Sequence, residues 1–152
     1  MRGIVCEMNN ESKKFYFMKF IATKTHGYLD YIVGFLLIIS PWMFDFDRGR
    51  IETWLPILLG ASAIMYSLFT DYEMGVSRQI PMRMHLTLDL ISGILLAVSP
   101  WLFGFADYVY APHLILGIME IGAALFTKTK PGVERTTYRS RRTPRAHEKS
   151  LS

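Results

Sequence analysis

The sequence predicts an all-α fold, namely an integral membrane four-helix bundle built from two tandem, parallel two-helix repeats. Three observations lead to this prediction: four apolar blocks almost free of charge, a motif that recurs after 59 residues, and basic residues gathered at the two ends. Residues 1–25 and 128–152 hold 13 of the 17 Lys and Arg. The overall apolar content of 51% therefore conceals an apolar middle between two polar tails.

The apolar blocks cover residues 31–44, 53–69, 90–106 and 111–127. A helix needs about 20 residues to cross the hydrocarbon core, with about 17 as the lower limit, and each block reaches that length with its polar edge. A soluble bundle is the alternative, but its helices would carry charged outer faces. Stretches such as residues 32–39 are apolar on all sides. Lipid is therefore the expected solvent.

The basic residues predict the orientation. With both termini in the cytoplasm, the inner segments hold fifteen Lys and Arg, whereas the outer loops hold only Arg48 and Arg50. Aromatic side chains then fall near the outer interface, where amphipathic rings collect. They are Trp42, Trp54, Trp101, Tyr108 and Tyr110.

Residues 26–46 align with residues 85–105 at 12 identical positions out of 21. The second helix of each unit aligns more weakly, at an offset of 57. Both copies contain an even number of spans, so they cross in the same sense and are related by an axis along the membrane normal. The expected organisation is an N-terminal tail with an interfacial segment or an extension of the first span (1–25), repeat 1 (26–70), a cytoplasmic connector (71–84), repeat 2 (85–127) and a disordered basic tail (128–152).

The repeated unit reads H-x3-D-x3-G-x5-S-P-W, once over His26–Trp42 and again over His85–Trp101. In this doubled motif the chain resembles the SPW-repeat family of bacterial integral membrane proteins, over residues 20–127. The resemblance implies a bacterial plasma (inner) membrane location and a plan of two repeats and four helices. It implies no established activity.

The Ser-Pro-Trp segments have a structural interpretation. Proline lacks an N–H and kinks or ends a helix, while serine before proline can cap a new helical turn. The sequence leaves both alternatives open, with the tryptophans as interfacial anchors or, less simply, as a ligand-binding pair. These residues are Ser40, Pro41, Trp42, Ser99, Pro100 and Trp101. Small residues let helices approach closely in membranes, and this role is expected for Gly34, Gly60, Gly93 and Gly117.

Each repeat places a histidine and an aspartate four residues apart, and therefore on one helix face. Ionisable groups inside a membrane usually face the interior and pair with one another, so one interpretation is a local His–Asp bond in each first helix. Glu120 lies mid-helix where repeat 1 has Ala63, and helix packing could bring the three carboxylates to one level. The expected polar cluster is His26, Asp30, His85, Asp89 and Glu120.

Three functions follow from these residues. The cluster could handle protons or a small solute, or the protein could be a structural or assembly unit that packs on a protein partner or a second copy. In both cases no cofactor is required. The alternative is a membrane haem- or metal-binding protein that uses His26 and His85, either on opposite sides of one haem iron or sharing a divalent metal with the aspartates.

Other classes have little support in the sequence. No phosphate-binding loop, nucleophile elbow, HExxH motif or dinucleotide fingerprint is present, so an enzyme is not indicated. The lone Cys6 cannot form an intramolecular disulfide. The Arg-rich tail lacks the interleaved aromatics of a nucleic-acid binder and is expected to lie on anionic lipid of the bilayer or simply to fix the orientation.

Overall fold

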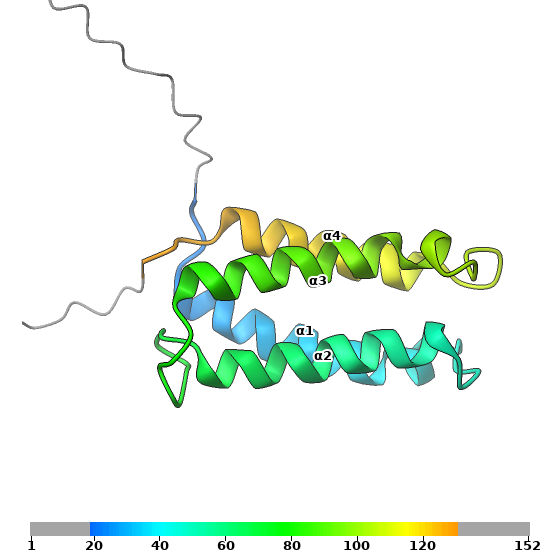
Figure 1. The fold of residues 1–152 in the computed structure, drawn as a ribbon, viewed down its shortest axis with the longest axis horizontal. Helices are drawn as coiled ribbons and strands as arrows, with labels where there is room; N and C mark the ends of the chain where they lie inside the picture. The colour runs from blue at the N-terminus through cyan, green and yellow to red at the C-terminus, as the bar shows by residue number, and fades with distance from the viewer. Residues whose placement is uncertain (1–18, 131–152) are drawn as a thin grey trace, which may run out of the picture.

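The computed structural model describes residues 19–130, which form four helices (Figure 1). The helices are α1 (Thr23–Met43), α2 (Ile51–Phe69), α3 (Met82–Leu102) and α4 (Ala111–Phe126). Between residues 19 and 130 no strand is present, only two isolated bridges. The predicted all-α, four-helix fold is confirmed.

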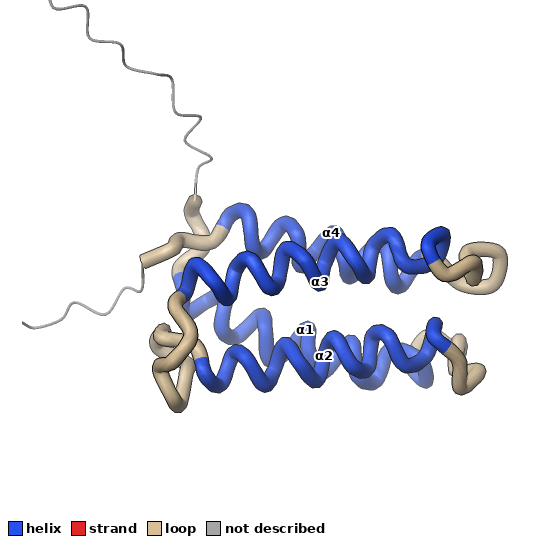
Figure 2. The backbone as a smooth tube through the Cα atoms, in the orientation of Figure 1, coloured by secondary structure: helices blue, strands red, loops and turns tan. Residues whose placement is uncertain are grey.

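The helices form two hairpins, α1–α2 and α3–α4, that lie side by side (Figure 1). The loops lie at the two ends of the bundle (Figure 2), with the α2–α3 connector at one end and both hairpin loops at the other. Packing within a hairpin is much closer than packing between hairpins, and α1 contacts α4 less than α2 contacts α3. Contacts between the helices therefore hold the two hairpins together only weakly.

The Ser-Pro-Trp segments lie in the last turn of α1 and α3, so the first helix of each repeat continues through its proline. The alternative of a new helical turn that starts at the serine is wrong. The physical reason is that a serine hydroxyl replaces the N–H that the proline lacks. Pro41 has no N–H to offer the carbonyl of Leu37, and the Ser40 hydroxyl donates to that oxygen instead, at 2.8 Å. Ser99 donates to Leu96 in the same way, at 2.7 Å.

Beyond each proline, the backbone closes the helix in the same manner in both repeats. The N–H of Phe44 donates to Ser40 and that of Phe46 to Pro41, as those of Phe103 and Phe105 do to the equivalent residues of α3. Trp42 and Trp101 then point outward, 60% and 57% exposed. Their position at the hairpin-loop end is the one expected of interfacial anchors.

Glycines hold each hairpin together. A Cβ atom on Gly60 would lie 2.5 Å from the carbonyl oxygen of Gly34, and one on Gly117 would lie 2.6 Å from that of Gly93. The two backbones are therefore in direct contact, as is typical of small-residue interfaces between membrane helices.

The exposed surface of the bundle is apolar, whereas much of its interior is polar. Ile32 and Leu58, for example, are 63% and 62% exposed, while histidine, threonine and serine side chains are buried. Two helices, α2 and α3, are long and apolar enough to cross a membrane; α4 is apolar but has 16 residues.

The tails largely lie outside the described residues. Residues 19–22 precede α1 without being helical, so an extension of the first span reaches back only to Thr23. Residues 14–18 of the predicted interfacial segment (14–25) and the basic tail beyond residue 130 belong to the part of the chain that the structure does not describe.

The glycine contacts lead to a stability prediction. Gly60→Ala should lower the free energy of unfolding by about 1–3 kcal/mol, because a methyl group there meets backbone rather than a flexible side chain. Gly122→Ala is the matched control, since nothing lies within 4 Å of its new Cβ atom. Thermal unfolding of the detergent-solubilised protein measures both, and equal effects at the two glycines would contradict this account of the packing.

Candidate metal centre

Four ionisable side chains from the two hairpins meet at one point. They are His26 and Asp30 of α1 with His85 and Asp89 of α3, and one ligand atom of each lies within 4.8 Å of the others. Both histidines are almost fully buried, 1% and 0% exposed. The sequence placed each pair on one helix face; the structure brings the two pairs together into one cluster, called the His/Asp centre below.

The bonds of the centre run between hairpins as well as within helices. His26 Nε2 lies 3.0 Å from Asp89 Oδ2 and 3.3 Å from Asp30 Oδ1. His85 Nε2 lies 3.0 Å from Asp30 Oδ2 and 3.2 Å from Asp89 Oδ2. The expected local pairs exist, but the shorter contact of each histidine is to the aspartate of the other repeat.

Two threonines, which the sequence analysis missed, fix the orientation of the imidazoles. Thr70 Oγ1 donates to the carbonyl of Tyr66 at 2.7 Å and lies 2.9 Å from His85 Nδ1. Thr127 Oγ1 donates to the carbonyl of Ala123 at 2.6 Å and lies 3.0 Å from His26 Nδ1. A hydroxyl has one proton, so each threonine oxygen must accept from an Nδ1–H.

The tautomer follows from these bonds. With the proton on Nδ1, a neutral imidazole has its lone pair on Nε2. Both Nε2 atoms face the two carboxylates, and they lie 3.3 Å from each other. Lone pairs and carboxylate oxygens repel at such distances, so the centre requires protons, on Nε2 or on a carboxyl oxygen, or a cation among the four groups.

The dimensions suit a small cation. Ligand atoms around a tetrahedral zinc ion, with bonds of about 2.0–2.1 Å, lie roughly 3.3–3.4 Å apart. The contacts of the two Nε2 atoms with each other and with their nearest carboxylate oxygens are 3.0–3.3 Å, the two histidines using different oxygens of Asp30. With one ligand atom taken from each residue, all four atoms lie within 4.8 Å of one another. A haem would have to enter between two Nε2 atoms that lie 3.3 Å apart and that already contact the aspartates.

Neighbouring side chains cover and support the centre. The Tyr66 hydroxyl donates to Asp89 Oδ1 at 2.6 Å, and Ser67 donates to Asp30 Oδ2 at 3.1 Å. Tyr72 of the α2–α3 connector is buried, with its ring 5.7 Å from that of His85, and it packs where a side chain on Gly27 would lie. Neither tyrosine recurs in the other repeat, so the repeat pattern gave no signal for them.

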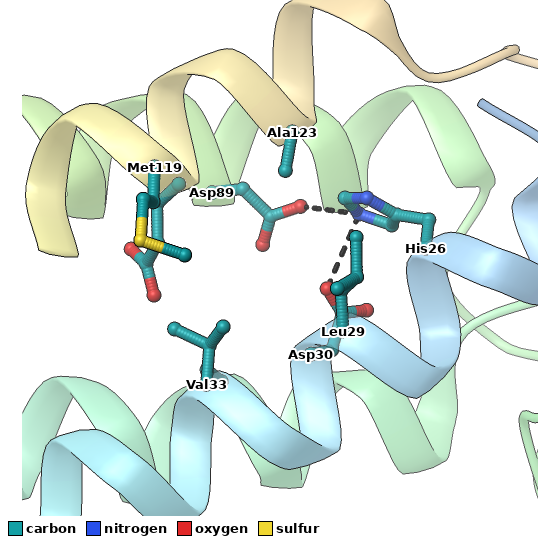
Figure 3. Close-up of a pocket in the computed structure, with 9 residues that line it drawn as sticks. His26, Leu29, Asp30, Val33, Asp89, Met119 and Ala123 are labelled. Atoms are coloured by element: carbon teal, nitrogen blue, oxygen red, sulfur yellow. Dashed lines mark hydrogen bonds and ion pairs between the residues drawn. The ribbon is translucent and has the colours of Figure 1, made fainter. Parts of the chain in front are cut away.

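A small cavity of about 50 Å³ adjoins the centre (Figure 3). Asp30 and Asp89 point from α1 and α3 toward His26 at its edge. Glu120, the fifth member of the expected cluster, lines this cavity and accepts a hydrogen bond from Ser92 at 3.3 Å. It is therefore a neighbour of the centre rather than part of it. The other lining residues are Leu29, Val33, Ala63, Met119 and Ala123.

The remaining buried histidine lies toward the other end of the bundle. His113 Nε2 is 3.0 Å from the backbone oxygen of Glu52, and the ring packs between Phe46 and Phe105. No second metal-like group is found within residues 19–130.

The two halves of the centre obey the repeat. His85 and Asp89 follow His26 and Asp30 by 59 residues, and Thr127 follows Thr70 by 57. The bridges Ile21–Thr127 and Thr70–Ile80 are related in the same way, so each repeat begins beside the end of the other. Each of these bridges therefore joins the last residue of one repeat to a residue just before the start of the other repeat.

Comparison with known proteins agrees with this organisation. The SPW repeat domain family matches residues 24–127, which include both hairpins and both Ser-Pro-Trp segments. No curated protein and no solved structure matches the chain. Because the match extends over most of the chain and over both repeats, the protein belongs to the SPW repeat family.

Proposed function

We propose that the protein is an integral membrane protein that holds one divalent transition-metal ion, of the zinc type, between its two hairpins. The observation that carries the metal proposal is the pair of buried imidazoles whose Nδ1 protons are fixed by Thr70 and Thr127. Their Nε2 atoms are thereby directed, with two carboxylates, at a single point.

The membrane part of the proposal rests on the distribution of polarity. Large apolar side chains cover the outside of the bundle, and the ionisable groups of the centre lie inside. This is the arrangement that lipid favours and water opposes. Trp42, Trp54, Trp101, Tyr108 and Tyr110, all at the hairpin-loop end, are exposed as interfacial anchors would be. The excess of basic residues in the inner segments supports cytoplasmic termini, and the family supports a bacterial inner membrane.

Charge supports the metal. With neutral imidazoles the two aspartates leave the centre at minus two, a charge that cannot stay uncompensated inside a membrane. One divalent ion neutralises it. Two protons would also do so; if both were on Nε2, two cationic rings would have their nitrogens 3.3 Å apart.

The donor set supports the zinc type. Imidazole nitrogen with carboxylate oxygen suits Zn²⁺ and its neighbours, and tetrahedral geometry favours Zn²⁺ among them. The Nδ1–H···Oγ bonds are the outer contacts that metal-binding histidines usually make. Four protein ligands leave no open position for a reacting water, so we propose metal binding rather than catalysis.

The second candidate is proton handling by the same groups. Glu120 favours it, because a third carboxylate lies on the cavity beside the centre. This function would appear as proton flux through reconstituted vesicles that Glu120→Gln abolishes. A purely structural or assembly role, with a partner or with anionic lipid on the basic tail, would need neither metal nor flux.

Zinc titration tests the metal proposal. Protein extracted from membranes and stripped with a chelator should bind one Zn²⁺ per chain and become more stable to heat, because the ion binds only the folded state. His26→Ala and His85→Ala should each weaken binding by more than about 100-fold, since changes to outer contacts alone typically cost 10–100-fold.

His113→Ala is the control for that titration, because it removes a buried histidine that lies away from the centre. It should leave one Zn²⁺ site of unchanged affinity. Wild-type protein that binds no Zn²⁺, or a site lost equally in all three variants, would contradict the proposal.

The threonines provide an independent prediction. Thr127→Val removes the acceptor of the His26 Nδ1 proton and should weaken Zn²⁺ binding about 10–100-fold, whereas Thr127→Ser should restore it. Thr87→Val is the matched control, because Thr87 also donates to the carbonyl four residues earlier but contacts no histidine. Calorimetric titration measures all three, and equal affinities for Thr127→Val and Thr87→Val would show that the threonine does not orient the ligand.

A further inference from the structure

Within the second helix of each repeat, the symmetry is broken at two positions beside the His/Asp centre. At the offset of 57, Tyr66 of α2 corresponds to Ala123 of α4, and Ala63 corresponds to Glu120. One flank of the centre thus carries a large ring, and the other carries a carboxylate beside a small residue. The ligands and their threonines are the same in both repeats, so the difference concerns access and not the binding groups.

Tyr66 closes the flank between α2 and α3. Its hydroxyl donates to Asp89 at 2.6 Å, and its ring packs edge-on against His85 with centroids 5.1 Å apart. The ring is therefore held at both ends against two of the four ligand residues.

The opposite flank, between α1 and α4, is filled less completely. Ala123 is too small to fill the position equivalent to Tyr66, and the cavity of about 50 Å³ lies there, with His26, Asp30 and Asp89 on its wall. One water needs roughly 10–15 Å³ measured with a water-sized probe. The cavity can hold a few waters or a partly hydrated ion.

Glu120 is the remaining ionisable side chain on that cavity, whose other walls are mostly apolar. A metal ion that leaves the His/Asp centre must pass through this mostly apolar cavity. It needs an oxygen ligand along the way, because an unpaired charge in a low dielectric is very costly. Ser92 holds the Glu120 carboxylate by a hydrogen bond of 3.3 Å.

From this asymmetry we infer that Zn²⁺ enters and leaves the His/Asp centre from one flank only, through the α1–α4 cavity, with the Glu120 carboxylate as a transient ligand. The inference rests on the proposed function and adds the route of exchange to it. Glu120 contributes to the rate of exchange, whereas the four ligands determine the affinity.

The test is the rate at which zinc-loaded protein releases Zn²⁺ to an excess of a fluorescent chelator, measured with the equilibrium affinity in the same detergent. Glu120→Gln should slow release at least fivefold and change the affinity less than twofold. Ala123→Tyr, which copies the closed flank, should slow release further. Glu52→Gln is the control, since it alters a buried glutamate toward the other end of the bundle, and its release rate should equal that of wild type.

The reverse variant covers the case in which Ala123→Tyr does not fold. Tyr66→Ala opens the second flank and should speed release, whereas Tyr66→Phe keeps the ring and removes only the hydroxyl, so the Ala variant should release faster than the Phe variant. If zinc binds but Glu120→Gln releases it at the wild-type rate, or the two Tyr66 variants do not differ, the one-sided route is wrong and the metal centre stands. Absence of zinc binding by wild type would overturn the proposed function, and the route with it.

Discussion

Thr70 and Thr127 each follow the last residue of a helix and have a single hydroxyl proton, which goes to the carbonyl four positions earlier in that helix. The oxygen can then only accept, so the neighbouring histidine must donate from Nδ1. This constraint turns both Nε2 atoms toward the two carboxylates. The protonation of the two imidazoles, the proposed affinity for a cation and the His–Asp bonds between the hairpins all depend on this orientation.

The same centre explains how two weakly packed hairpins form one bundle. Within a hairpin, Gly34 meets Gly60 and Gly93 meets Gly117 with backbones in contact. Between hairpins such contacts are few, and in lipid no hydrophobic force draws helices together. Crossed bonds at the His/Asp centre, from His26 to Asp89 and from His85 to Asp30, provide a connection that neither hairpin could make alone. A cation there would therefore stabilise the assembly of the repeats as well as the site.

Much of the fold could be predicted from the sequence because its signals are local. Apolar length placed α2 and α4 to within two residues, whereas α1 and α3 begin eight residues before their apolar blocks. The recurrence of His26 and Asp30 as His85 and Asp89 indicated equivalent depths. The end of each first helix could not be decided, because Ser40 can either cap a new turn or replace the donor that Pro41 lacks. The structure shows the replacement.

The composition of the centre was harder to foresee. A local His–Asp pair satisfies the spacing of four residues equally well, and only the packing of the hairpins shows that the two pairs merge. Thr70 and Thr127 could have been found, since they share the offset of 57 that relates the second helices. Tyr66 and Tyr72 could not, because they have no counterpart in the other repeat and their sequence contexts resemble ordinary interfacial aromatics.

X-ray absorption at the zinc edge of the loaded, detergent-solubilised protein tests the central claim most directly. The account predicts four nitrogen or oxygen ligands at about 2.0–2.1 Å, with the outer-shell scattering of two imidazoles and no sulfur. A six-coordinate shell of oxygen atoms without imidazole scattering would show that the ion binds elsewhere and that the histidines serve only as partners of the aspartates.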